Sequence, residues 1–127
     1  MGPIRVGVDI VELERIRKAA RRPRFLSRIL TAEEQAAVDK DELIRLAASF
    51  ALKEAAWKAL PPCLQKKTYF HQVRVIWREP GVQLEIAGWR GKTVACWQVF
   101  QGQILALVIL SRPDLFPGQG ISVKGDP

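Results

Sequence analysis

One segment with the pattern of a helix carries the residue types that most suggest chemistry. Its apolar residues recur at steps of three and four and so define an inward face, formed by Leu43, Leu46, Ala47, Phe50 and Trp57. Glu54 falls on this face, and Lys58 follows one helical turn later. An inward carboxylate needs an ion-pair partner, a metal ion or a shifted pKa. The simpler interpretation is an exposed Glu54–Lys58 pair, as on many helices.

A second carboxylate that can join Glu54 is Asp9, near the end of the first predicted strand. Residues 4–10 alternate in polarity, with Asp9 on the face opposite the isoleucines and valines. If the long helix packs near the end of this strand, the two carboxylates converge. Two oxygen ligands suit Mg²⁺, which keeps several waters and is completed by substrate phosphates. Lys58 would then contact the same phosphates as a point charge.

The charge of the chain predicts an anionic partner. The formal net charge is +7 over 127 residues, which suits a nucleic acid, an acidic protein or a phosphorylated small molecule. Residues 15–28 hold seven arginine or lysine residues and no acidic residue. This segment is interpreted as a docking patch for an acidic surface, with a solvated basic face as the alternative. A nucleic acid is the less favoured partner, because the sequence lacks a recognised nucleic-acid motif.

Composition also narrows the class of protein. A chain of this length fits one domain with one core. It has no run of about 18 or more apolar residues, so no membrane span is expected. No secretory signal is apparent at the N-terminus. Cys63 and Cys96 lack metal-ligand spacing, and two reduced thiols in a cytoplasmic protein are the expected state.

The pattern of elements predicts an α+β domain over residues 1–111, followed by a loosely ordered tail over residues 112–127. Thr31 and Glu34 form a capping box that starts a short helix. The long helix runs to about Leu60 and is stopped by two prolines. An antiparallel meander that the long helix covers then follows, and its last strand is apolar enough to be central and buried on both faces. Its predicted strands are residues 72–77, 82–86, 93–100 and 104–110.

Three blocks of the sequence resemble the holo-acyl-carrier-protein synthases, the small bacterial 4′-phosphopantetheinyl transferases. They are residues 7–16, 25–34 and 50–59. The resemblance implies an α+β transferase fold, an antiparallel meander packed on one long central helix plus shorter helices. It also implies a Mg²⁺-dependent enzyme that transfers the phosphopantetheine arm of coenzyme A to a serine of an acidic acyl carrier protein. It further implies a cytoplasmic homotrimer, with active sites between protomers, that serves fatty acid biosynthesis.

The resemblance also implies roles for individual residues. It assigns Asp9 and Glu54 to the metal, and Glu54 and Lys58 to catalysis, with Glu54 as the candidate base for the attacking serine. Contacts to coenzyme A fall to Lys53, Lys58 and Gly81. Because the first helix docks the carrier in this family, the docking residues are expected to be Arg15, Lys18, Arg21 and Arg28.

The chain departs from the family pattern at several coenzyme A contacts. Pro61-Pro62-Cys63 replaces a Gly-Thr-Gly segment, and Gly81-Val82-Gln83 lacks the lysine of a Gly-Lys-Pro turn. Ser49 replaces an arginine, and residues 93–99 lack the histidine of a strand that contacts coenzyme A from a neighbouring protomer. The sequence therefore resembles a divergent member of this family. The alternative function is a carrier-binding or assembly partner with weak or lost catalysis.

Overall fold

The computed structural model describes residues 4–37 and 42–112. Within them, no helix has the length and apolar character needed to cross a membrane. The predicted tail lies outside the described residues except for Arg112. In chain order, the elements are β1 Ile4–Glu12, α1 Leu13–Ala19, α2 Pro23–Ile29, α3 Ala32–Ala37, α4 Leu43–Ala59, α5 Pro62–Gln65, the 3₁₀ turn η1 Phe70–Gln72, β2 Val73–Arg78, β3 Gly81–Ile86, β4 Lys92–Phe100 and β5 Gln103–Ser111.

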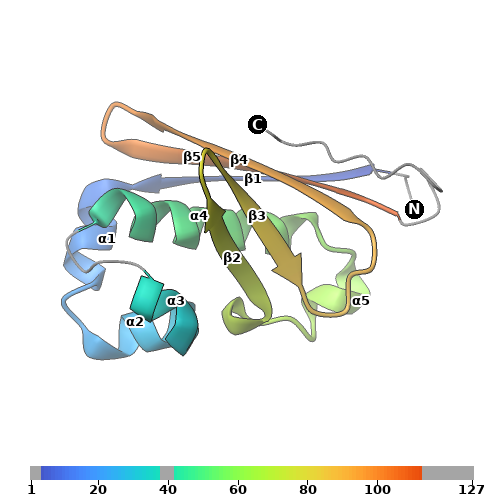
Figure 1. The fold of residues 1–127 in the computed structure, drawn as a ribbon, viewed down its shortest axis with the longest axis horizontal. Helices are drawn as coiled ribbons and strands as arrows, with labels where there is room; N and C mark the ends of the chain where they lie inside the picture. Colours follow the sequence, from blue (N-terminus) through green and yellow to red (C-terminus); the bar gives the residue numbers. More distant parts are fainter. Residues whose placement is uncertain (1–3, 38–41, 113–127) are drawn as a thin grey trace.

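The strands form two antiparallel groups rather than one meander. β1, β5 and β4 make a three-stranded sheet in that order, and β2 and β3 form a separate hairpin. β1 pairs with β5 along its whole length, from Ile4 opposite Ser111 to Glu12 opposite Gln103. The predicted α+β fold, with antiparallel strands packed on one long central helix, is confirmed. The four strands after α4 are divided between two sheets, and the N-terminal strand β1 pairs with the last strand, β5. Figure 1 shows α4 lying between the sheet and the hairpin.

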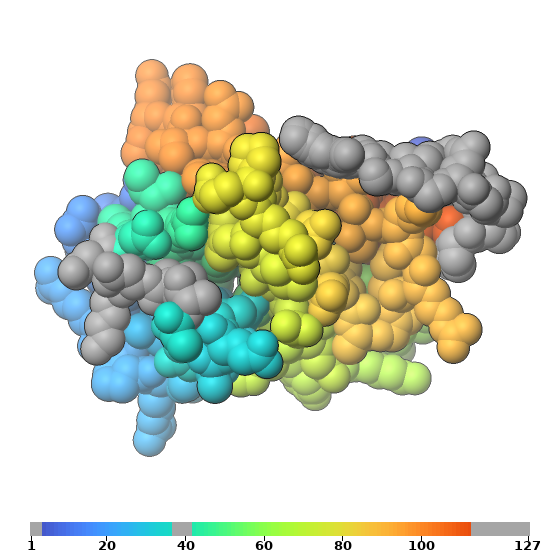
Figure 2. Space-filling model, in the orientation of Figure 1, coloured from blue at the N-terminus to red at the C-terminus, as the bar shows by residue number. Residues whose placement is uncertain are grey.

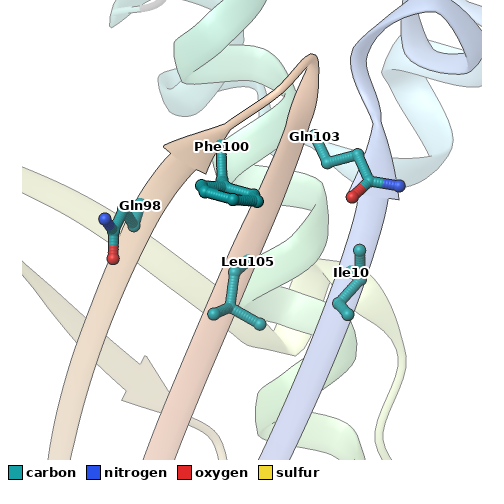
Figure 3. Close-up of a pocket in the computed structure, with 5 residues that line it drawn as sticks. All are labelled: Ile10, Gln98, Phe100, Gln103 and Leu105. Carbon is teal, nitrogen blue, oxygen red and sulfur yellow. The ribbon is translucent and has the colours of Figure 1, made fainter.

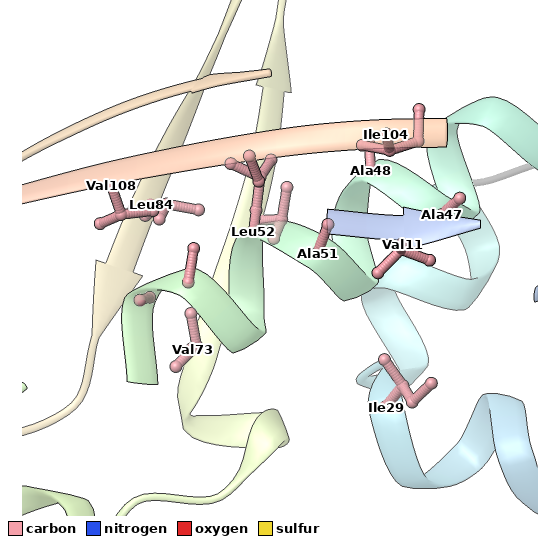
Figure 4. Packing of buried hydrophobic residues seen from close by; sticks show 14 of the residues in the cluster. Val11, Ile29, Ala47, Ala48, Ala51, Leu52, Val73, Leu84, Ile104 and Val108 are labelled. Atoms are coloured by element: carbon pink, nitrogen blue, oxygen red, sulfur yellow. The ribbon is translucent and has the colours of Figure 1, made fainter. Parts of the chain in front are cut away.

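Helix α4 is buried on two sides, which corrects the inward face expected from the sequence. The sheet packs on one side of α4, and strand β2 of the hairpin packs on another. In the space-filling view the hairpin lies across the front of the molecule (Figure 2). Phe50 is therefore only partly buried and Trp57 is 40% exposed, whereas Leu52 and Lys53 are fully buried. Small side chains of α4 face β1: Figure 4 shows Val11 beside Ala47 and Ala51.

β5 is the central strand of its sheet, as expected, but only one of its faces is buried. Ile104, Ala106 and Val108 are inaccessible and face α4, whereas Leu105 is 40% exposed. The expectation of a strand buried on both faces is wrong because, among the described elements, the helix covers only one side of this sheet. The sheet face away from α4 also presents apolar side chains of β5, although the apolar composition of this strand predicts that they are buried.

Two local signals in the sequence are confirmed in detail. Thr31 Oγ1 accepts a hydrogen bond from the backbone N–H of Glu34 at 3.1 Å, and Glu34 Oε1 accepts one from the N–H of Thr31 at 2.9 Å. This reciprocal pair is the predicted capping box. Helix α4 ends at Ala59, just before the prolines, and Arg5 Nε donates to the Ala59 carbonyl at 2.6 Å. A carbonyl left free by the helix end is thus satisfied.

Candidate active site

Strand β1 approaches α4 so closely that only glycine fits at their contact. A Cβ atom on Gly7 would lie 1.8 Å from the Ala55 carbonyl oxygen and 2.9 Å from the Ala59 nitrogen. Successive strand residues alternate between faces, so Gly7, Asp9 and Val11 all point toward the helix. Because Gly7 lies against residues 55–59 and Val11 against residues 47–51, Asp9 faces the part of α4 that carries Glu54.

The structure brings Asp9, Glu54 and Lys58 together. Lys58 Nζ donates a hydrogen bond to Asp9 Oδ1 at 2.8 Å and lies 3.5 Å from the Val8 carbonyl oxygen. The ion pair of Lys58 is therefore with Asp9, rather than the simple surface pair with Glu54 that the helix spacing also allows. Two carboxylates and one ammonium thus lie together at the contact of β1 and α4.

The electrostatics of this cluster follow from its geometry. Burial raises the pKa of Glu54 above its ordinary value, the charge of Asp9 raises it further, and Lys58 partly opposes both. The hydrogen bond to Asp9 is the main cause that raises the pKa of Lys58. Glu54 is therefore a stronger base than a free glutamate, and Lys58 is held as a cation.

The donor set of the cluster fits one kind of metal ion. Within the described residues, no group of three or more histidine, cysteine, aspartate or glutamate side chains is placed to hold a metal. A fully protein-made cage, as for structural zinc, would need such a group. Two carboxylates are enough for Mg²⁺, because it usually keeps several waters and takes the rest of its oxygens from substrate phosphates.

Lys53 does not reach this cluster, which corrects its expected role as a coenzyme A contact. Its side chain is fully buried, and Nζ donates to Glu34 Oε1 at 2.8 Å and to the carbonyls of Phe70 and Val73 at 2.9 and 2.6 Å. Burial lowers the pKa of Lys53, and the hydrogen bond and charge of Glu34 partly restore it. With all three of its protons donated inside the protein, Lys53 has a structural role.

Glu34 completes this buried network. The sequence predicted its role as a helix cap but not its ion pair with Lys53. Its carboxylate is 8% exposed and accepts hydrogen bonds from the backbone N–H groups of Thr31 and Val75 as well as from Lys53. The network therefore joins α3, α4, η1 and β2 immediately beside Glu54. Two features of the sequence could have indicated this network. One is the capping-box residue Glu34, which has no lysine three or four residues away on its own helix, and the other is Lys53, directly before Glu54.

Gly81 lies at the other end of the helix from Lys58. It faces Arg78 at the turn of the β2–β3 hairpin, and Glu79 in that turn accepts a hydrogen bond from Arg45 at 2.7 Å. Arg45 and Lys58 are thirteen residues apart on α4, a distance of about 20 Å along the axis. Gly81 is therefore not brought to the Asp9 cluster within one chain.

The four expected docking residues are all exposed on the first two helices. Arg15 and Lys18 lie on α1, Arg21 follows it, and Arg28 lies in the last turn of α2. Within the described part of the chain, none of these four side chains makes a hydrogen bond or ion pair, in contrast to Arg17, which pairs with Glu14 at 3.2 Å. These four residues therefore present unpaired positive charge on a surface that begins at Arg15, six residues after Asp9.

The segment that replaces the expected glycines forms a compact corner. Pro61 is buried, and α5 starts at Pro62. Trp57 Nε1 donates to the Gln65 carbonyl at 3.0 Å, and Gln65 Nε2 donates to the Trp57 carbonyl at 3.0 Å. This reciprocal pair fixes the chain just past Lys58, where glycines would leave the backbone free to approach a ligand.

The uncovered face of the three-stranded sheet is apolar. Ile10, Leu105 and Gln98 lie in one cross-strand row, and Val8, Leu107 and Cys96 in the next. Figure 3 shows Ile10, Leu105 and Phe100 projecting from the strands on the side away from α4, where they line a pocket with two glutamines. The exposed apolar residues of this sheet face include Ile4, Val6, Val8, Ile10, Phe100 and Leu105.

Comparisons with known proteins identify the class. Residues 5–108 match the model of the 4′-phosphopantetheinyl transferase superfamily. A holo-[acyl-carrier-protein] synthase of an Exiguobacterium species is 32% identical over 111 residues, which is 84% of this chain and 91% of the relative. One from Solidesulfovibrio magneticus is 45% identical over 73 residues, covering 56% of this chain and 59% of its own length.

A solved structure shares the fold at similar coverage. The holo-(acyl-carrier-protein) synthase from Bacillus anthracis, solved in complex with coenzyme A (3′,5′-ADP), superposes with a TM-score of 0.72 at 27% identity, over 85% of this chain and 96% of that one. The chain therefore belongs to the 4′-phosphopantetheinyl transferase superfamily, a family of transferases. Within that superfamily, its relatives are holo-acyl-carrier-protein synthases.

Proposed function

We propose that this chain transfers the 4′-phosphopantetheine arm of coenzyme A to a serine of an apo acyl carrier protein in a Mg²⁺-dependent reaction. The observation that carries the proposal is the meeting of Asp9, Glu54 and Lys58 between β1 and α4 in a chain of this family. The sequence matches the family at the blocks that supply these three residues. Cytoplasmic location and a carrier of fatty acid biosynthesis belong to the same proposal.

The three residues divide the chemistry between them. Asp9 and Glu54 would hold Mg²⁺, which would neutralise negative charge on the diphosphate. The serine hydroxyl attacks the phosphorus next to the pantetheine arm, its proton passes to Glu54, and the bond to 3′,5′-ADP breaks with the electron pair leaving on that nucleotide. Lys58 contacts the phosphates.

The basic surface of α1 and α2 recognises the carrier. Acyl carrier proteins are typically acidic, so Arg15, Lys18, Arg21 and Arg28 present the complementary charge. Long-range attraction between the two surfaces mainly raises the association rate and weakens with salt. Because α1 follows β1 directly, a carrier docked on α1 presents its serine near Asp9.

The quaternary structure in this proposal is a homotrimer with active sites between protomers. The apolar outer face of the three-stranded sheet supports it, because a contiguous exposed apolar patch usually marks an interface. A neighbouring copy also gives Gly81 and residues 93–99 a way to contact coenzyme A bound at the Asp9 cluster. The separation of Gly81 from Lys58 along α4 leaves no such route within one chain.

A labelling assay tests the transferase function. The protein is incubated with coenzyme A, Mg²⁺ and a panel of apo carrier proteins, and mass spectrometry follows the gain of one phosphopantetheine arm. Asp9→Asn and Glu54→Gln should abolish labelling, whereas Lys67→Met, which removes an exposed charge outside the cluster, should leave it unchanged. If the parent protein labels no carrier, or if Asp9→Asn labels as fast as the parent, the proposal is wrong.

A second candidate function is a carrier-binding or assembly partner with weak or lost catalysis. The fixed corner of Pro61, Pro62, Trp57 and Gln65 favours it, because flexible glycines are replaced beside the phosphate-contacting lysine. Calorimetry separates the two functions. Tight carrier binding with no detectable coenzyme A binding supports the partner, whereas coenzyme A binding with labelling supports the enzyme.

A further inference from the structure

Lys58 forms an ion pair with the Asp9 carboxylate, which a metal ion at this cluster would need as a ligand. Lys58 Nζ lies 2.8 Å from Asp9 Oδ1, and the Asp9 side chain is only 12% exposed. An ammonium at hydrogen-bond distance takes up one of the oxygens available to a cation. A divalent ion that uses this oxygen therefore has to displace Nζ or bind with a positive charge beside it.

The cluster needs a positive charge whether or not a metal is present. Asp9 and Glu54 face each other across the contact of β1 and α4, and the charge of one disfavours ionisation of the other. In the protein alone, Lys58 supplies the balancing charge from one turn further along the helix. Its side chain is 45% exposed, so it can swing toward solvent without unfolding the helix.

We infer that Lys58 is a resident counter-ion of Asp9 that a divalent metal displaces, and that the displaced ammonium then binds the diphosphate of coenzyme A. This inference rests on the proposed function, because it uses its metal ion and its substrate. Metal binding is then an exchange of one cation for another. The metal and coenzyme A also help each other to bind, since each favours the state in which Lys58 has left Asp9.

This exchange has a signature that a simple phosphate contact would not have. Removing the ammonium should strengthen metal binding to the protein alone, because nothing has to leave Asp9. The same change should weaken the coupling between metal and coenzyme A, because the released group is missing. By linkage, the effect of the metal on the affinity for coenzyme A and the effect of coenzyme A on the affinity for the metal should decrease by the same factor.

Calorimetric titration of the full chain with Mn²⁺ and with Mg²⁺ tests the inference without measuring activity. Lys58→Met and Lys58→Gln should bind the metal at least about fivefold more tightly than the parent, about what a partly exposed ion pair is worth. Lys67→Met lowers the net charge equally at an exposed side chain that makes no hydrogen bond or ion pair with the described residues, and it should bind like the parent. Repeating the titrations with saturating coenzyme A should bring the Lys58 variants and the parent closer together.

The outcomes separate this inference from the proposed function. If Lys58→Met binds metal no more tightly than the parent while Asp9→Asn loses binding, the metal site stands and the counter-ion role is wrong. If Lys67→Met strengthens binding as much as Lys58→Met, only net charge matters and the inference is again overturned. If the parent binds neither ion, even with coenzyme A present, the metal site and the inference fail together.

Discussion

Replacing Lys53 by methionine is expected to lower the free energy of unfolding by about 3–5 kcal/mol, because it breaks a buried ion pair by removing one partner. Methionine keeps much of the buried stem, so the change is mainly electrostatic. It leaves the Glu34 carboxylate, only 8% exposed, without its counter-charge. It also leaves the carbonyls of Phe70 and Val73 without this donor.

The size of this loss is large for a domain of this length. Natural domains are stable by about 5–15 kcal/mol in total. A loss of 3–5 kcal/mol corresponds to a fall in Tm of about 10–20 °C. Glu34→Gln should cost less, because the amide oxygen still accepts one hydrogen bond in the network. The double variant should cost less than the sum of the two single changes by about 1 kcal/mol or more, since both act on one interaction.

Urea denaturation followed by circular dichroism measures these differences. The matched control is Lys67→Met, which removes an exposed lysine charge outside both clusters and should change the free energy of unfolding by no more than about 0.5 kcal/mol. If Lys53→Met loses less than about 1 kcal/mol, or if the two single changes are fully additive, the network does not hold α3, α4 and β2 together as argued.

Three further predictions concern the contact, the pH dependence and the assembly. Gly7→Ala should abolish Asp9-dependent metal binding in calorimetry and lower Tm, because its Cβ would overlap the Ala55 carbonyl oxygen; unchanged metal affinity would show that the contact does not position Asp9. Glu54→Gln should raise the stability of the metal-free protein at neutral pH, and this gain should vanish below the ordinary pKa of a glutamate. Because the pKa of Glu54 is raised in the folded protein, the contribution of Glu54 to stability is full at low pH and is lost as the pH rises through the raised pKa. An equal gain at pH 3 and pH 7 in urea denaturation would contradict this sign. Ile10→Lys should shift the oligomer toward monomer in sedimentation, whereas Ile44→Lys, with similar exposure on α4, should not; the same sedimentation for both variants would rule out the sheet face as the interface.

The central cluster could be predicted from the sequence because each of its members obeys a local rule. Asp9 lies near the end of an alternating strand, and Glu54 and Lys58 are one turn apart on a helix with clear stop signals. Their meeting needed only that the helix pack on that strand. The capping box of Thr31 and Glu34 was likewise readable, since both partners lie within three residues.

What failed were inferences about which side of an element is buried. Helical spacing defines one inward face only if the helix has one neighbour, and α4 has two, so Lys53 is buried where Glu54 was expected to be. Alternation in β1 separates two faces without saying which faces the core. The apolar set of Ile4, Val6, Val8 and Ile10 lies outward, and the set with Gly7 lies inward. In the proposed homotrimer, partner copies of the chain would cover this apolar outer face, and local sequence patterns carry no information about such copies.

The contact at Gly7 also limits how this protein can change over time. A tight contact between two side chains can usually be relieved by a smaller residue on the partner, so the two positions can drift together. Here the opposing atom is the backbone oxygen of Ala55, which every residue type at position 55 would carry. No second substitution in α4 makes room for a side chain at position 7, and the spacing of strand and helix is therefore fixed independently of the surrounding sequence.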